Sequence, residues 1–279
     1  MPELPEVQAL AERLAPVLVG DRVERVVALS FSGLKTVAPR PEELVAKTVA
    51  RVGRRGKFLV IEVEDGLRLL VHLGQAGRLD LESPPRSTRP KGALFRLGLA
   101  GGVALLVREH GRERKAGWWV LAPGEDGPLA ALGPEAGSQA FAELVMRAAG
   151  KERLHTWLRD QRVVAGLGRG HTDDVLNRAG LSPFATPGRL DAGERDRLVS
   201  SVREVLAEAL ARERRRTGGL SAASLGDRFA VHNRKGEPCP RCGTPIASVS
   251  FSTYEIDYCS RCQTGGRVLA DRRLSRLLR

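Results

Sequence analysis

Apolar and polar residues recur with one period in the first half of the chain and with another in the second half. Short apolar runs bounded by Gly or Pro predict strands of a β-sandwich or barrel. The five runs cover residues 22–29, 58–63, 67–73, 93–99 and 103–107. Before them, Val7, Leu10, Leu14, Val17 and Leu18 form one stripe, which predicts a helix over residues 6–18.

The second half has the period of helices. Residues 141–149, 152–160, 173–179 and 192–216 are expected to be helical. The last of these begins near Asp191 and stops at Thr217-Gly218-Gly219, because glycine is typical of a helix end. Residues 129–138, rich in Gly, Ala and Pro, are the expected linker between the two halves.

The balance of charge narrows the choice of partners. The chain has 279 residues, 42% of them apolar, and a formal net charge of +12. Such a charge attracts polyanions and favours nucleic acid, although a basic protein with a merely solvated surface has the same composition. No segment approaches the roughly 20 apolar residues that span a bilayer, and the N-terminus does not resemble a signal peptide. We therefore expect a cytoplasmic protein without a membrane partner.

Four cysteines stand near the end of the chain as two CxxC pairs. They are Cys239, Cys242, Cys259 and Cys262. Two such pairs supply four thiolates to one tetrahedral Zn²⁺, and the spacing favours a β-hairpin with one pair in each strand's turn. Two disulfides or a redox pair are the alternatives. We expect one structural zinc, whose binding folds the hairpin.

The N-terminal residues suggest covalent chemistry. Removal of Met1 would leave Pro2 with a free secondary amine, whose pKa of about 7.7–8.0 leaves part of it neutral at pH 7. A neutral amine attacks an aldehyde-like carbon and forms an iminium. Glu3 could then protonate a departing oxygen, and Glu6 could cap the helix or move protons. Alternatively, these acids and prolines only begin a helix.

Several motifs, in order, resemble the formamidopyrimidine-DNA glycosylase and endonuclease VIII family. The first is Met1-Pro-Glu-Leu-Pro-Glu-Val7, and the last is the zinc hairpin over residues 236–263. Between them lie Arg54-Arg-Gly-Lys-Phe58, Val71-His-Leu-Gly-Gln75, the linker motif Leu132-Gly-Pro-Glu135, and residues 158–168, which resemble the entry to a helix–two-turn–helix. The resemblance covers about residues 1–263.

The resemblance implies an α+β multidomain fold. We expect an N-terminal helix and β-sandwich over residues 1–128, a linker over 129–138 and a helix–two-turn–helix domain over 139–225. A zinc β-hairpin with four cysteine ligands would follow over 226–263, and a basic tail over 264–279. The implied enzyme is a monomer of the bacterial nucleoid that repairs double-stranded DNA carrying a damaged base or an abasic site.

The resemblance also implies a mechanism. Pro2 would attack C1′ of a flipped nucleotide, Glu3 would protonate the sugar ring oxygen, and Lys57 would lie near the phosphates. The strand would break by β- and then δ-elimination. One alternative is a catalytically weak protein of the same fold that binds damaged or abasic DNA, and another is a zinc-dependent RNA-binding factor, which would not explain the N-terminus.

The chain departs from the family's pattern where DNA is bound. Arg169 stands in place of the usual asparagine, and Tyr254 stands in place of the arginine before the third cysteine. Tyrosine carries no charge at pH 7, so the phosphate clamp is weakened unless Arg241 and Arg261 replace it.

The residues expected to fill the gap in the duplex also differ. The loop that enters DNA makes His72 and Gln75 candidate contacts, with Gln75 in place of a methionine. The second loop contributes Arg112 and Arg114 and has no aromatic residue. Residues 220–231 are short for a loop that caps a flipped purine, so we expect 8-oxoguanine not to be the preferred substrate.

Overall fold

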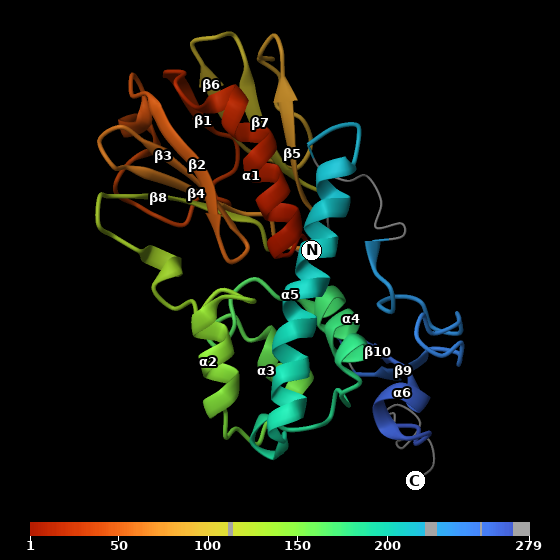
Figure 1. The fold of residues 1–279 in the computed structure, drawn as a ribbon. Helices are drawn as coiled ribbons and strands as arrows, with labels where there is room; N and C mark the ends of the chain where they lie inside the picture. The colour runs from red at the N-terminus through yellow and green to blue at the C-terminus, as the bar shows by residue number, and fades with distance from the viewer. Residues whose placement is uncertain (111–113, 221–227, 252, 270–279) are drawn as a thin grey trace. The chain divides into compact units, whose positions relative to one another are not determined.

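A computed structural model describes residues 1–110, 114–220, 228–251 and 253–269 (Figure 1). The chain divides into two compact units. The first unit comprises Met1–Ala130 and Leu210–Ser224, and the second comprises Ala131–Ala209 and Leu225–Arg279.

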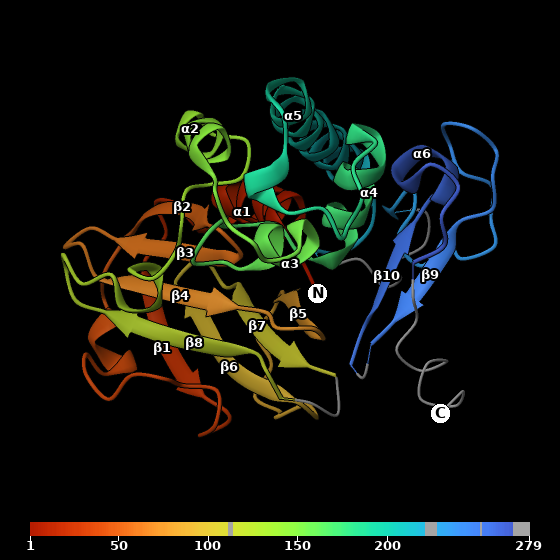
Figure 2. The same ribbon diagram turned by 90° about the horizontal axis from the view of Figure 1, so that it is seen from below.

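The first unit is a sandwich of two antiparallel four-stranded sheets, which Figure 2 shows as two layers. One sheet has the order β1–β6–β7–β5 and the other the order β2–β3–β4–β8. The strands are β1 (Val23–Ala28), β2 (Val49–Arg55), β3 (Phe58–Val63), β4 (Arg68–His72), β5 (Gly77–Glu82), β6 (Ala93–Leu99), β7 (Ala104–Glu109) and β8 (Gly117–Leu121).

Helix α1 (Leu4–Leu18) shares one apolar core with both sheets. Its stripe is buried as predicted, through Val7, Leu10, Leu14 and Leu18, while Val17 packs at the edge of the core. Two short 3₁₀ turns, η1 (Pro41–Leu44) and η2 (Gly127–Leu129), complete the unit. The predicted sandwich with an N-terminal helix is confirmed.

Three strands, β2, β5 and β8, were not expected from the sequence. β2 has the sequence VARVGRR, and most of its side chains are half-buried or exposed, so no clear alternation marks it as a strand. β8, with the sequence GWWVL, is buried at four of its five positions and therefore lacks the period of a strand with one solvated face.

The second unit consists of helices and a small hairpin. Its helices are α2 (Gln139–Arg147), α3 (Leu154–Arg159), α4 (Arg169–Ala179) and the short α6 (Ser260–Thr264), with one 3₁₀ turn, η3 (Pro187–Arg189). The hairpin strands are β9 (Ala247–Ser250) and β10 (Glu255–Tyr258). Helix α5 (Ala192–Arg215) begins in this unit, and its last residues belong to the first unit.

Helices α3 and α4 enclose a pair of turns that one side chain holds together. The Gln161 amide donates to the carbonyls of Arg159, at 2.8 Å, and Leu167, at 2.7 Å, while its oxygen accepts from the amide of Gly166 at 3.0 Å. Gln161 thus satisfies backbone groups that the turns leave without partners. The predicted helix–two-turn–helix is confirmed, although α4 begins four residues earlier than expected.

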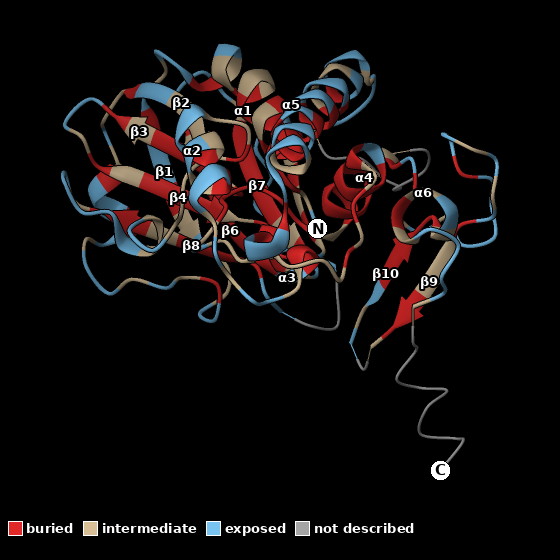
Figure 3. Ribbon diagram, turned by 60° about the horizontal axis from the view of Figure 1, so that its bottom comes forward, coloured by how far each residue is buried: buried red, intermediate tan, exposed pale blue. Residues whose placement is uncertain are grey.

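Helix α4 is buried over most of its length, as the red ribbon in Figure 3 shows. It is therefore the central helix of the second unit. In the described part of the chain, no helix is both long and apolar enough to cross a membrane.

Candidate functional site

The start of α1 places two carboxylates, those of Glu3 and Glu6, close to the N-terminus of the chain. Glu3 is the N-cap residue, and the Glu6 Oε2 accepts a hydrogen bond from the Glu3 amide at 2.7 Å. This capping interaction satisfies a backbone donor that the first turn would leave without a partner. Both carboxylates are buried, with 3% and 5% of their surface exposed, and Pro2 is half-buried beside them. Glu6 therefore caps the helix, one of the two roles expected for it.

The C-terminal end of α5 contacts α1 through side chains of both helices. Arg214 forms an ion pair with Glu12 at 2.7 Å, and its hydrogen bonds lower the pKa of the Glu12 carboxyl. Arg13 in turn donates to the carbonyls of Glu213 and Arg216. These contacts fix the direction of the helix that carries Pro2 and Glu3.

Lys57 lies in the turn between β2 and β3, and only 5% of its surface is exposed. Lys57 is therefore not a solvated lysine at the end of a strand. The same turn is tied to α1, because the Arg54 Nε donates to the Gln8 Oε1 at 3.0 Å. The N-terminal helix and the lysine turn are thus positioned against each other.

His72 ends β4 close to Lys57. Burial, and then the charge of Lys57, lower the pKa of His72 from 6.5 to about 4. Its Nδ1 accepts from the Gly74 amide at 3.3 Å, and its ring lies 4.9 Å from the ring of Phe58. His72 is therefore neutral at pH 7 and provides a polar group beside the lysine without adding charge.

Gln75 is exposed at the tip of a tight turn between β4 and β5. The Gly77 amide donates to the Leu73 carbonyl at 2.8 Å, and a Cβ at Gly77 would lie 2.2 Å from that oxygen. Only glycine permits this close approach. The turn therefore presents Gln75 outward from a rigid base.

The second expected loop starts beside this turn. Glu109, at the end of β7, accepts hydrogen bonds from the backbone amides of Lys115 and Ala116 at 2.8 and 2.9 Å. These bonds hold together the two ends of the loop. Arg114 is exposed, and Arg112 lies outside the described residues. The contribution of Glu109 was missed, because nothing in the sequence around it distinguishes a buried carboxylate from a solvated one.

In the second unit, Arg169 is the first residue of α4, directly after the N-cap Gly168. Its side chain is half-buried. The backbone amides and dipole at the start of a helix favour an anion, and a guanidinium adds two donors suited to phosphate. This position therefore combines two features that bind phosphate.

Tyr254 lies between the hairpin strands and stacks with Phe251, His155 and Arg159. Its ring stacks on Phe251, with centroids 4.8 Å apart, and the Arg159 guanidinium carbon lies 4.6 Å from its centroid. Arg241 instead donates to the Asn177 carbonyl at 2.7 Å, at the end of α4. The cation beside Tyr254 therefore comes from α3, and Arg241 is engaged elsewhere.

The four cysteines form the candidate metal centre. One ligand atom from each lies within 4.8 Å of the others, and the Cys242 and Cys259 sulfurs are 3.5 Å apart. Sulfurs around a tetrahedral zinc lie about 3.8 Å apart, so the four thiols fit one zinc. Cys259 and Cys262 occupy the N-cap and third residue of α6, so the expectation of a pair in each strand's turn is wrong for the second pair.

Helix α4 carries the acidic residues that hold the segment before the cysteines. The Asp174 carboxylate accepts hydrogen bonds from the backbone amides of Ala230 and Val231 at 2.9 and 2.8 Å. The Asp173 Oδ2 lies 2.6 Å from the His232 Nδ1. These residues were also missed. Two adjacent aspartates in a helix usually indicate a solvated face, whereas here both are buried.

Comparison with known protein families accounts for most of the chain. Residues 1–165 match the formamidopyrimidine-DNA glycosylase N-terminal domain. Residues 132–219 match the H2TH domain of formamidopyrimidine-DNA glycosylase, and residues 236–265 match the zinc finger found in FPG and IleRS. The zinc finger contains all four cysteines, which agrees with one bound zinc.

Curated relatives and solved structures indicate the same family as the domain matches. A formamidopyrimidine-DNA glycosylase of Mesorhizobium japonicum is 34% identical, over 95% of this chain and 100% of the relative. One of Rhodospirillum rubrum is 37% identical, over 88% and 92% of the two chains. A Lactococcus lactis Fpg, in a complex with DNA containing an abasic site, is 25% identical with a TM-score of 0.81, over 94% and 99% of the chains. The chain therefore belongs to the formamidopyrimidine-DNA glycosylase family of DNA repair enzymes, as its motifs indicated.

Proposed function

We propose that the chain excises a damaged base and cleaves the resulting abasic site, with the Pro2 amine as nucleophile. The observation that supports this proposal most directly is the position of Pro2 beside a buried carboxylate at the start of α1. Pro2 is half-buried and precedes a buried Glu3, and α1 is anchored by Arg214 and by the Arg54 contact to Gln8. An amine held in this way has a carboxylic acid at the neighbouring residue and a buried lysine in an adjoining turn.

The reaction follows from these groups. The neutral Pro2 nitrogen bonds to C1′ and loses its proton, which the base takes up as it leaves with the electrons of its bond to C1′. Glu3 then protonates the ring oxygen as the sugar opens to an iminium. The iminium acidifies C2′, so loss of a proton there expels the 3′ phosphate, and a second elimination expels the 5′ phosphate. Water then hydrolyses the iminium and restores the amine.

The partner that this proposal requires is double-stranded DNA with a damaged base or an abasic site. C1′ is accessible only when the nucleotide has left the stack, and Gln75 and Arg114 are the proposed residues that occupy the gap. Arg169, Tyr254 and Arg159 are proposed to hold the phosphates. We propose that the protein acts as a monomer on the DNA of a bacterial nucleoid.

The preferred lesion is proposed to be something other than 8-oxoguanine. The basis is the short segment of residues 220–231, most of which lies outside the described residues. A flipped purine loses stacking energy that contacts to the base must recover, whereas an abasic site flips more easily. We therefore expect abasic sites, ring-opened purines or oxidised pyrimidines to be processed faster.

A second function is a damaged-DNA-binding protein with little catalysis. Arg169 and Tyr254 favour it, because both depart from the family's pattern at phosphate-binding positions. The buried, capped Glu3 and the buried Lys57 favour the enzyme, since a protein that only binds would not need acid and cation beside the N-terminus.

Borohydride trapping on an abasic duplex distinguishes the two functions. The chain should give a covalent adduct, which Pro2→Gly, or an added residue before Pro2, should reduce at least about tenfold. Pro5→Ala is the matched control, since it alters the same motif and leaves the amine unchanged. An undiminished adduct in the extended form would exclude Pro2 as nucleophile, and no adduct in any form would favour the binding protein.

A further inference from the structure

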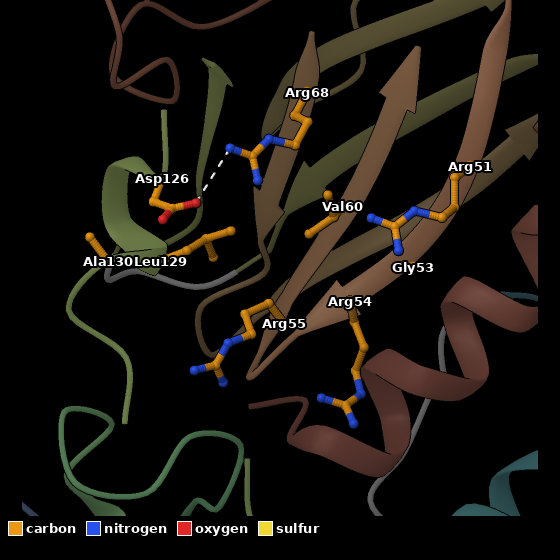
Figure 4. A pocket seen from close by; sticks show the side chains of 9 residues that line it. All are labelled: Arg51, Gly53, Arg54, Arg55, Val60, Arg68, Asp126, Leu129 and Ala130. Carbon is orange, nitrogen blue, oxygen red and sulfur yellow. Dashed lines mark hydrogen bonds and ion pairs between the residues drawn. The ribbon is translucent and has the colours of Figure 1, made fainter. Parts of the chain in front are cut away.

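The outer face of the sheet formed by β2, β3, β4 and β8 contains a hollow of about 410 Å³, shown in Figure 4. We call it the arginine hollow. It is lined by Arg51, Gly53, Arg54, Arg55, Val60, Arg68, Asp126, Leu129 and Ala130. All of these residues belong to the first unit.

Gly53 leaves the hollow open. It lies in the middle of β2, paired with Val60 of β3, and Arg51 and Arg55 stand two residues to either side on the same face. Its φ is not positive, and a Cβ built on it would meet no atom within 4 Å. Neither backbone conformation nor packing requires glycine here. A glycine within a strand often marks a place where a ligand or another backbone comes close, and the space beside Gly53 is open.

The lining of the hollow is strongly cationic. It has four arginines and one carboxylate, Asp126, which pairs with Arg68 at 3.5 Å. Arg51 pairs with Glu62, on the neighbouring strand, at 2.9 Å. These exposed ion pairs orient the two arginines and contribute little stability. Arg54 donates to the Gln8 Oε1 at 3.0 Å and to the Gly56 carbonyl at 3.5 Å.

The floor of the hollow is apolar. Val60 belongs to a small cluster with Leu70 and Leu121, against which Phe58, Trp119 and Leu129 pack. Figure 4 shows Arg51, Arg55 and Arg68 around Val60. An apolar floor lowers the local dielectric and strengthens the attraction between these guanidinium groups and an anion.

We propose that the arginine hollow binds a phosphate group. Guanidinium groups match phosphate through paired donors, and the volume exceeds that of a single phosphate. The phosphate could belong to a nucleic-acid backbone or to a free oligophosphate, and the chemistry of recognition is the same. The site lies on the outer face of a sheet, and it does not depend on the chemistry proposed for Pro2.

Two variants test the site in different ways. Gly53→Val places in the hollow a side chain that strands favour and whose Cβ meets no atom within 4 Å, so the fold should be kept. The double variant R51Q/R55Q removes two positive charges and leaves the hollow unfilled. It tests the site if Gly53→Val does not fold. Arg25→Gln, at an exposed position of β1 in the other sheet, is the matched control for charge.

Two measurements identify the ligand, namely calorimetric titration with pyrophosphate and the salt dependence of affinity for an undamaged duplex. A nucleic-acid ligand predicts a shallower slope of log K against log salt in Gly53→Val and R51Q/R55Q, by about 0.9 for each phosphate that the variant no longer neutralises. This change should exceed any change in Arg25→Gln. A free oligophosphate predicts pyrophosphate binding that both variants lose and Arg25→Gln keeps. If neither property separates the two variants from Arg25→Gln, the proposal is overturned.

Discussion

Burial decides the chemistry of the individual residues around the N-terminus. Glu3, Glu6 and Lys57 were identified from sequence as chemically capable, but their burial could not be predicted, because each alone is of a residue type normally found on the surface. His72, expected from the sequence as a DNA contact, lies beside Lys57, and its pKa is lowered to about 4 by burial and by the charge of Lys57. The candidate site therefore has a neutral imidazole beside Lys57 at pH 7.

Replacing Glu3 by Gln should separate the two chemical steps. Protonation of the sugar ring oxygen accompanies base release, so release should slow by at least about 100-fold, the usual scale for a general acid. Cleavage of a preformed abasic site should slow by less than about tenfold. The measurement is single-turnover kinetics on a lesion duplex and on an abasic duplex, and equal losses would show that Glu3 only caps α1.

His72 should make the first unit sensitive to acid. Its pKa is about 4 in the folded state and 6.5 ordinarily, so the unfolded chain takes up a proton first as pH falls. The stability that neutral His72 contributes is complete above pH 6.5 and is lost between pH 6.5 and 4. His72→Gln should therefore lose less in Tm than the parent chain between pH 7 and pH 4.5. Equal losses in both proteins would contradict the assignment.

Among the structural elements, the sequence predicted those that have one clear apolar face or a complete set of metal ligands. The stripe of α1 and the spacing of the cysteines specified a helix and a zinc finger. β2 was not predicted, since its outward side chains are charged or absent around the arginine hollow. The stacking of Arg159 on Tyr254 could not be predicted either, because these residues are far apart in sequence.

Arg159 should supply the charge that Tyr254 lacks. A guanidinium stacked by its face keeps its N–H edges available to phosphate, so Arg159→Gln should weaken binding of an abasic duplex by about 10-fold or more, as loss of a charged hydrogen bond does. Tyr254→Phe should retain affinity, while Tyr254→Ala should lose it. Arg147→Gln, in an exposed ion pair on α2, is the control. Equal binding by Arg159→Gln and Arg147→Gln would assign the clamp elsewhere.

Removing one zinc ligand should affect the finger and not the sandwich. Cys259→Ser should lose zinc, because three thiolates no longer complete the tetrahedral site, and should lose DNA affinity with it. The first unit has its own core and should keep its unfolding transition. Metal analysis, duplex binding and thermal unfolding check the three effects. Normal binding of abasic DNA by the zinc-free variant would contradict the role given to the finger.

The whole molecule combines a net charge of +12 with two compact units. The charge and the order of motifs were enough to predict the class of partner and the family, because both are properties of the sequence itself. The choice of lesion could not be predicted in this way, since it depends on contacts that form only with DNA. The central claim for the molecule is that its reactive group is an amine at the N-terminus.

The most direct test of that claim is to locate the DNA on the protein after borohydride trapping. The adduct is digested with trypsin and the modified peptide is identified by mass spectrometry. An adduct formed as proposed lies on the peptide of residues 2–13, at the Pro2 nitrogen, and it requires that Met1 has been removed. An adduct on Lys57, with the N-terminal peptide unmodified, would contradict the proposal and make the buried lysine the nucleophile.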